Sequence, residues 1–143
     1  MNTDLNTYAN FVHNLTSNTS KHLASAVNRL EDLDENRLED GTQGPKFNVP
    51  LLMTAAMGMC SETGEFMEVV KKCLWQGKPF TEEVRFHLKR ELGDQMFYWT
   101  QACVALGYSI DEVIEENKTK LSARYPAGHF ETFYSENRQQ GDL

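Results

Sequence analysis

Apolar residues recur every three or four positions along much of this chain, which is the spacing of one face of an α-helix. Between residues 50 and 76 they form a single seam that includes one acidic residue, Glu62. A second long helix is expected between Thr81 and Gly107. The first seam comprises Leu52, Ala55, Met59, Glu62, Phe66, Val69 and Cys73, and the second Val84, Leu88, Leu92, Met96, Trp99, Cys103 and Leu106.

Breakers and capping residues place the ends of these helices. Residues 77–79, Gly-Lys-Pro, interrupt the pattern and predict a hairpin between the two long helices. Thr81 is a favourable N-cap for the second helix, and Gly107 is a favourable residue to end it. The two long helices should therefore lie antiparallel.

A third helix is expected after Gly107. Ser109 and Glu112 have the spacing of a capping box, in which each side chain bonds the backbone of the other residue. The helix should end near Arg124, because Pro126 disfavours helical geometry at the preceding residue.

The N-terminal part predicts two amphipathic helices, at 5–15 and at about 20–38, with Ser20 as the N-cap of the second. No segment shows convincing strand alternation. The expected fold is all-α, a helical bundle built on the long antiparallel hairpin. We expect one domain over residues 1–143, with core helices at about 50–124 and a tail at 126–143.

Charge and cysteine content narrow the class of protein. The 143 residues carry 14 basic and 21 acidic side chains, a net charge of −7, so the chain has no electrostatic reason to coat polymeric nucleic acid or an anionic membrane, and neither is an expected partner. The three cysteines, Cys60, Cys73 and Cys103, are an odd number within apolar patterns, so we expect small buried side chains in a reducing compartment. No signal peptide or membrane span is expected, and the predicted location is the cytoplasm.

Four carboxylates stand out on the two long helices. Glu62 and Glu65 lie three apart on the first helix, and Glu91 and Asp94 lie three apart on the second. Glu62 and Asp94 are equally far in sequence from Lys78, and so are Glu65 and Glu91. Folding the hairpin about Lys78 therefore brings all four acids to one level.

Such a cluster needs a counter-charge. Two like charges 4 Å apart repel by about 4 kcal/mol at an effective dielectric constant of 20. A cation or a proton with a raised pKa must compensate, and oxygen ligands at this density suit Mg²⁺, with Mn²⁺ as a substitute. The alternative is that the acids form a solvated helix face, as most Glu-x-x-Glu patterns do.

The histidine residues do not show the pattern of a di-iron site, and the aromatic residues fit a helical core. A ferritin-like di-iron site requires Glu-x-x-His pairs, which the sequence lacks. The scattered histidines are expected in surface or capping roles, and the aromatic residues at helical spacing in the core, with stacking on a base as the alternative. The residues concerned are His13, His22, His87, His129, Trp75, Tyr98 and Trp99.

The order and spacing of these residues resemble the MazG-like nucleoside triphosphate pyrophosphohydrolases, particularly the compact single-domain members from bacteria and phages. The resemblance covers about residues 52–142. The segments that carry it are MGMCSETGE at 57–65, VKK at 70–72, ELGD at 91–94 with Tyr98, Asn117, KL at 120–121 and RYP at 124–126.

The resemblance implies Mg²⁺-dependent hydrolysis of nucleoside triphosphates, dNTPs or modified NTPs, to a monophosphate and pyrophosphate. Glu62 and Glu65 match the family's first metal-binding pair, and Glu91 and Asp94 match its second. These four are the expected catalytic residues, and one of them is expected to orient the attacking water. The resemblance also implies a homodimer or homotetramer in which the hairpins form a four-helix bundle.

Phosphate contacts are expected from four polar side chains, Lys72, Asn117, Lys120 and Arg124. The last three share one face of the third helix, where Arg124 can bind phosphate through two N–H groups. For Lys120, stabilisation of the helix C-terminus is an equally good interpretation. For Lys72, the alternative partner is Glu68, one turn earlier.

Two alternatives to this function remain open from the residues. The same chemistry would also suit phosphoribosyl-ATP or dUTP as substrate. A protein of another class, a non-catalytic helical interaction module, would also explain two long amphipathic helices. Metal dependence distinguishes the two classes, because only a native metal site makes the melting temperature rise with metal concentration.

Overall fold

The computed structural model describes residues 4–138, which form helices joined by turns and loops, without a β-strand. Contacts within the chain divide it into two compact units that meet at Val49 and Pro50. The all-α class predicted from the sequence is confirmed. No helix in residues 4–138 is both long and apolar enough to cross a membrane.

The first unit holds α1 (Leu5–Leu15), α2 (Asn18–Lys21) and α3 (Leu23–Glu35). The first predicted helix is confirmed, whereas the expectation of one continuous second helix capped by Ser20 is wrong. The chain is extended at His22 (φ −128°, ψ 122°), which separates α2 from α3, and the hydroxyl of Ser17 caps α2 by accepting from Ser20 N. The helical spacing of apolar residues did not reveal this one-residue break.

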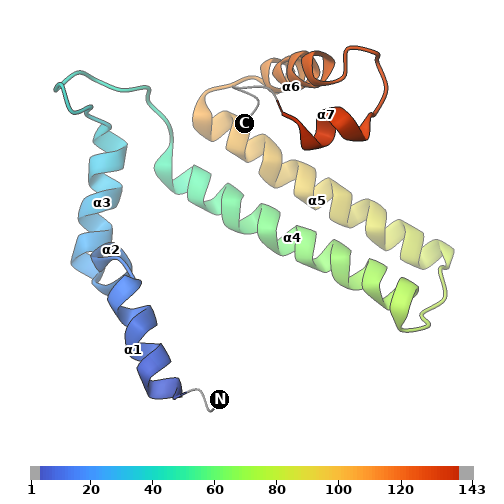
Figure 1. Ribbon diagram of the computed structural model, residues 1–143, viewed down its shortest axis with the longest axis horizontal. Helices are drawn as coiled ribbons and strands as arrows, with labels where there is room; N and C mark the ends of the chain where they lie inside the picture. The colour runs from blue at the N-terminus through green and yellow to red at the C-terminus, as the bar shows by residue number, and fades with distance from the viewer. Residues whose placement is uncertain (1–3, 139–143) are drawn as a thin grey trace. The chain divides into compact units, whose positions relative to one another are not determined.

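The second unit is built on α4 (Val49–Trp75) and α5 (Glu82–Leu106), which run antiparallel beside each other (Figure 1). Their predicted ends are confirmed. The Thr81 hydroxyl accepts a hydrogen bond from the backbone N–H of Val84, and Gly107 ends α5 in the left-handed conformation (φ 78°). The second long helix therefore begins and ends where its capping residues specify.

Two further helices follow the hairpin, α6 (Ile110–Arg124), which contacts α5, and α7 (Thr132–Glu136). Both bonds of the predicted capping box are present: Glu112 N donates to Ser109 Oγ at 3.2 Å, and Ser109 N donates to a Glu112 carboxylate oxygen at 2.7 Å. α6 ends at Arg124, as predicted. The sequence pattern did not predict α7, which lies within the expected C-terminal tail.

The seam predicted for α4 faces inward. Each of its seven members is buried or partly buried, including Glu62. Gly58, also buried, lies directly against the ring of Tyr98 on α5. These two residues are equally far in sequence from Lys78, so the contact confirms the register expected from folding the hairpin about that lysine.

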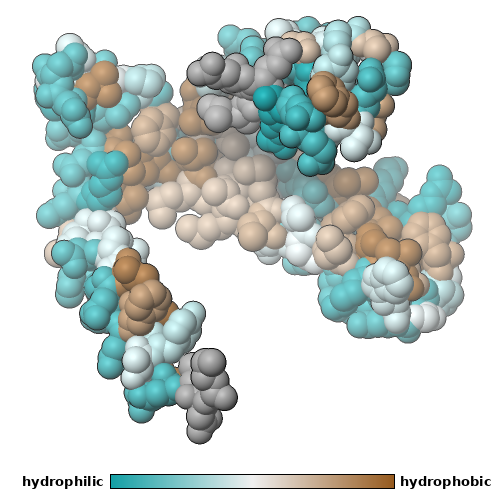
Figure 2. Space-filling view, viewed as in Figure 1, coloured by the Kyte–Doolittle hydropathy of each residue, from teal (hydrophilic) through white to brown (hydrophobic). Residues whose placement is uncertain are grey.

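The inner face of α5 differs from the predicted seam. Leu92 and Met96, expected inside, are 55% and 60% exposed, whereas Glu91 and the partly buried Gln95 and Tyr98 lie inside. The predicted seam is confirmed where its members are buried or partly buried, at Val84, Leu88, Trp99 and Cys103. It is wrong for Leu92, Met96 and Leu106, because it followed the apolar residues, while the buried face of this helix contains several polar ones. Apolar side chains along the hairpin consequently reach the visible surface (Figure 2).

Two smaller expectations also need correction. Of the three cysteines only Cys103 is buried; Cys73 is partly buried and Cys60 is exposed, since it lies beside the inward seam of α4 rather than on it. Trp75, expected in the core, is 81% exposed at the last position of α4, where the chain already turns toward α5.

Candidate metal centre

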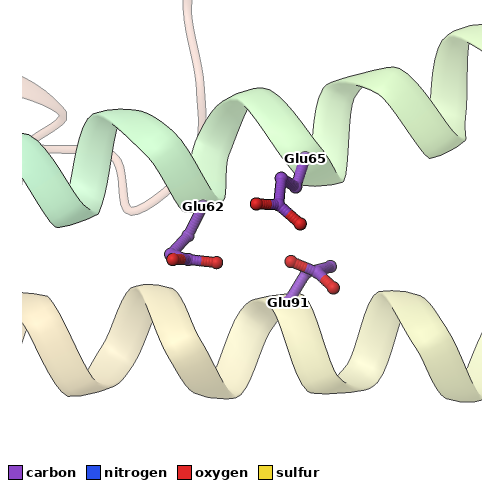
Figure 3. Close-up of side chains that lie close together, drawn as sticks. All are labelled: Glu62, Glu65 and Glu91. Atoms are coloured by element: carbon purple, nitrogen blue, oxygen red, sulfur yellow. The ribbon is translucent and has the colours of Figure 1, made fainter.

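Three of the four predicted carboxylates meet between the long helices. Glu62 and Glu65 extend from α4 and Glu91 from α5, and one oxygen atom of each lies within 4.8 Å of the others. Figure 3 shows the three side chains pointing into the space between the two helices. The helix register places them there, because Glu65 and Glu91 stand at one level on facing helices.

Glu91 is the most deeply placed member of the cluster. The residue is 6% exposed, and its Oε1 atom lies 2.9 Å from His87 Nε2. Its Oε2 atom is buried and has no hydrogen-bond partner within residues 4–138. A buried carboxylate oxygen without a donor is energetically unfavourable unless a cation or proton joins it.

The electrostatics of the cluster are those of crowded like charges. The pKa of Glu62 is raised above its ordinary value, first because partial burial removes water and then because Glu65, Asp94 and Glu91 are negatively charged. Glu62 therefore holds a proton more strongly than a free glutamate does. A cation in the cluster would remove the same repulsion.

Asp94 occupies a different position from the other three acids. It is exposed and does not belong to the group whose oxygens lie within 4.8 Å of one another. It is near enough for its charge to raise the pKa of Glu62. The structure thus brings three predicted ligands together and leaves the fourth beside them.

The predicted phosphate-binding residues are distributed over two helices. On α4, Lys72 Nζ lies 3.3 Å from a carboxylate oxygen of Glu68, the alternative partner that the spacing had offered. On α6, Asn117 is exposed, while Lys120 and Arg124 are partly buried.

His87 lies beside the cluster, where the sequence pattern did not place it. It was expected in a surface or capping role, yet its half-exposed ring bonds a predicted metal ligand. The signal was available in its position: His87 precedes Glu91 by four residues, so one helical turn places the two side chains on the same face. This spacing differs from the Glu-x-x-His pattern typical of di-iron sites, which the sequence lacks.

The donor set fits a hard divalent cation. All three clustered groups offer carboxylate oxygens, and Glu91 has an oxygen that is buried without a donor. Oxygens bound to one Mg²⁺ at about 2.1 Å lie at most about 4.2 Å apart, a separation close to the 4.8 Å within which the three oxygens lie. Mn²⁺ has the same ligand preference.

Comparison with known protein families identifies one family. A family model described as the MazG nucleotide pyrophosphohydrolase domain matches residues 52–129. A relative from Mycobacterium phage L5, the Gene 37 protein, is 36% identical over 78 residues, which cover 54% of this chain and 68% of the relative. No solved structure matches. The matched segment lies within the second unit and contains the whole acidic cluster.

Proposed function

The chain belongs to the MazG nucleotide pyrophosphohydrolase family, and on this basis we propose that it hydrolyses nucleoside triphosphates, dNTPs or modified NTPs, to the monophosphate and pyrophosphate. The observation that carries the proposal is the cluster of Glu62, Glu65 and Glu91, whose oxygens lie within 4.8 Å of one another. Such a site suits a polyphosphate, because Mg²⁺ bound by carboxylates keeps positions that phosphate oxygens fill.

Glu62, Glu65 and Glu91 would hold Mg²⁺, or Mn²⁺ in its place, and the neighbouring Asp94 would complete the set after a change of rotamer. When bound, the ion polarises phosphoryl oxygens and stabilises the negative charge that develops on pyrophosphate. The number of ions is left open. The bound cation would then neutralise the negative charges that help to raise the pKa of Glu62.

One of the chain's own carboxylates also accepts the proton that the attacking water loses. Water supplies the oxygen that forms a new bond to phosphorus, while the bond between that phosphorus and the bridging α–β oxygen breaks. One carboxylate of the cluster orients the water and accepts its proton, and pyrophosphate leaves with the bridging oxygen. Positioning and a general base are the two contributions that this arrangement of acids provides.

Lys72, Asn117, Lys120 and Arg124 are proposed to bind the phosphate groups. For Lys72 this requires exchange of its present partner Glu68 for a phosphate oxygen. The three residues of α6 lie on one face of that helix, so they would act together on one polyphosphate chain.

We also propose a homodimer or homotetramer located in the cytoplasm. The support is the outer surface of α5, where Phe86, Phe97 and Val104 are 59%, 57% and 62% exposed and share the side opposite the inner face. A second copy would cover them. Sedimentation at micromolar concentration tests the assembly, and a monomer there would contradict it.

Pyrophosphate release from a panel of dNTPs, NTPs, dUTP and phosphoribosyl-ATP, with Mg²⁺ or with EDTA, tests the function. Glu62→Gln should lower turnover by about two orders of magnitude or more with an unchanged helical CD spectrum, because it removes a ligand charge. Glu31→Gln, an exposed acid in the first unit, is the matched control and should retain full activity. No Mg²⁺-dependent release from any substrate would refute the proposal and favour an interaction module.

A further inference from the structure

His87 lies outside the acidic cluster but bonds its most buried member. The His87 Nε2 atom is 2.9 Å from Glu91 Oε1, the distance of an ion pair when the ring is protonated. Because an ionised carboxylate can only accept, a hydrogen shared between these two atoms belongs to Nε2. The ring itself is about half exposed. The contact joins two residues one turn apart on α5, and side chains at this spacing are neighbours on the helix surface.

The two oxygens of Glu91 consequently differ. Oε1 is paired with His87 at 2.9 Å, whereas Oε2 is buried and has no hydrogen-bond partner within the described chain. Figure 3 shows one Glu91 oxygen directed toward Glu62 and Glu65. The terminal torsion of a glutamate is broad and weakly restricted, so a hydrogen bond to one oxygen determines where the other points.

We propose that His87 is a positioning residue for the metal centre: by holding Glu91 Oε1 it directs Glu91 Oε2 toward Glu62 and Glu65 as a ligand atom. This inference rests on the proposed function, because it assumes that the cluster binds a divalent cation. Direct ligation by His87 is disfavoured, since the nitrogen that reaches the cluster is already bonded to Glu91 and the other ligands are oxygens. Hydrogen bonds from residues behind a metal ligand typically change metal affinity or activity by about 10–100-fold.

The test measures Mn²⁺ binding to the full-length protein at one fixed pH. Binding is detected as a loss of the EPR signal of the free ion. His87→Ala should weaken binding about 10-fold or more. His87→Gln, whose amide N–H reaches about as far as Nε2–H, should restore binding to within about 3-fold of the wild type. Lys89→Ala, which removes an exposed positive charge from the same helix, should leave affinity unchanged.

A turnover measurement separates positioning from simple stabilisation. If His87 acts through the metal ligand, saturating Mg²⁺ should recover most of the turnover that His87→Ala loses at low Mg²⁺, whereas Glu62→Gln should not recover. In wild-type protein, long-range ¹H–¹⁵N spectra of the histidine rings should show His87 protonated at Nε2 with and without Mg²⁺. This second measurement needs no variant that alters folding.

The outcomes are distinguishable. Equal Mn²⁺ affinity of wild type and His87→Ala, or a neutral His87 protonated only at Nδ1, would overturn the positioning role and leave the proposed function standing. Equal weakening by His87→Ala and His87→Gln would also overturn it, because the imidazole itself would then be required. Absence of Mn²⁺ binding by the wild type would refute the proposed metal centre and this inference together.

Discussion

The contact between Gly58 and Tyr98 predicts an unusual response to a common stabilising substitution. Alanine in place of glycine within a helix normally stabilises a protein by about 0.5–1 kcal/mol. A Cβ atom added to Gly58 would lie less than 3.0 Å from three ring atoms of Tyr98, a distance that real Cβ atoms essentially never show. Ordinary carbon contacts lie at about 3.5–4.0 Å, so the Tyr98 ring or one of the two helices must shift.

The expected change in the free energy of unfolding is the difference between these two opposing contributions. Overpacking of this kind costs about 1–3 kcal/mol. Subtracting the gain of about 0.5–1 kcal/mol in helix propensity, with the middle of each range, leaves Gly58→Ala about 1.3 kcal/mol less stable than wild type. The expected shift of the urea midpoint is about 0.5–1 M to lower concentration. The displacement also separates Glu62 from Glu91, so Mn²⁺ binding should weaken together with stability.

The chain supplies matched controls for this experiment. Gly64 on α4 and Gly93 on α5 are helical glycines at which an added Cβ would meet no atom within 4 Å, so alanine at either position should stabilise by about 0.5–1 kcal/mol. In a Tyr98→Ala background, Gly58→Ala should become stabilising as well. Equal urea midpoints for Gly58→Ala and Gly64→Ala, measured by CD at one protein concentration, would refute the packing of α4 against α5 at this level.

Three further predictions concern charge, capping and metal. Because the pKa of Glu62 is raised in the folded protein, the native state binds more protons than the unfolded state from the ordinary value of 4.5 up to the raised one. The unfolding free energy of the EDTA-treated protein should therefore fall as pH rises through this window, and an equally steep fall in Glu62→Gln would contradict the assignment. Ser109→Ala should lower the unfolding free energy by about 1 kcal/mol by removing one half of the capping box, while Ser122→Ala at an exposed position of α6 should change it by less than about 0.5 kcal/mol. Mg²⁺ at one hundred times its dissociation constant should add about 2.7 kcal/mol of stability in calorimetry, and an unchanged melting temperature, or an equal rise in Glu65→Gln, would exclude a native site at this cluster.

Much of the hairpin and its acid cluster follows from features that the sequence displays directly. The ends of α5 depend on Thr81 and Gly107, whose capping chemistry is local. The level of Glu65 with Glu91 depends only on antiparallel packing about Lys78. The capping residues were therefore sufficient to predict the ends of α5. The equal sequence distances from Lys78 were sufficient to predict that three of the four proposed ligands lie together.

The features that escaped prediction depend on tertiary context. Leu92 and Met96 look like core residues by hydropathy, but the side of α5 that faces α4 is set by the whole packed pair and includes Glu91. The break at His22 changes the backbone conformation of a single residue. The spacing of apolar residues along the sequence does not reveal so short a break. The four-residue spacing of His87 and Glu91 is visible in the sequence, but the proposed role of His87 depends also on the burial of Glu91 and on its oxygen without a donor, which the spacing does not reveal.

The polar inner face of α5 links the proposed metal centre to the proposed assembly. A hairpin that places Glu91 and Gln95 between its helices gives up apolar contacts at those positions, and buried polar groups add little net stability. Several large apolar residues of α5 are instead exposed, among them Phe97 and Met96 at 57% and 60%. Burying such side chains contributes about 1.5–3 kcal/mol each. Acids inside the hairpin and apolar side chains outside it are thus two consequences of one arrangement, and the proposed metal centre and the proposed assembly would each compensate for one of them.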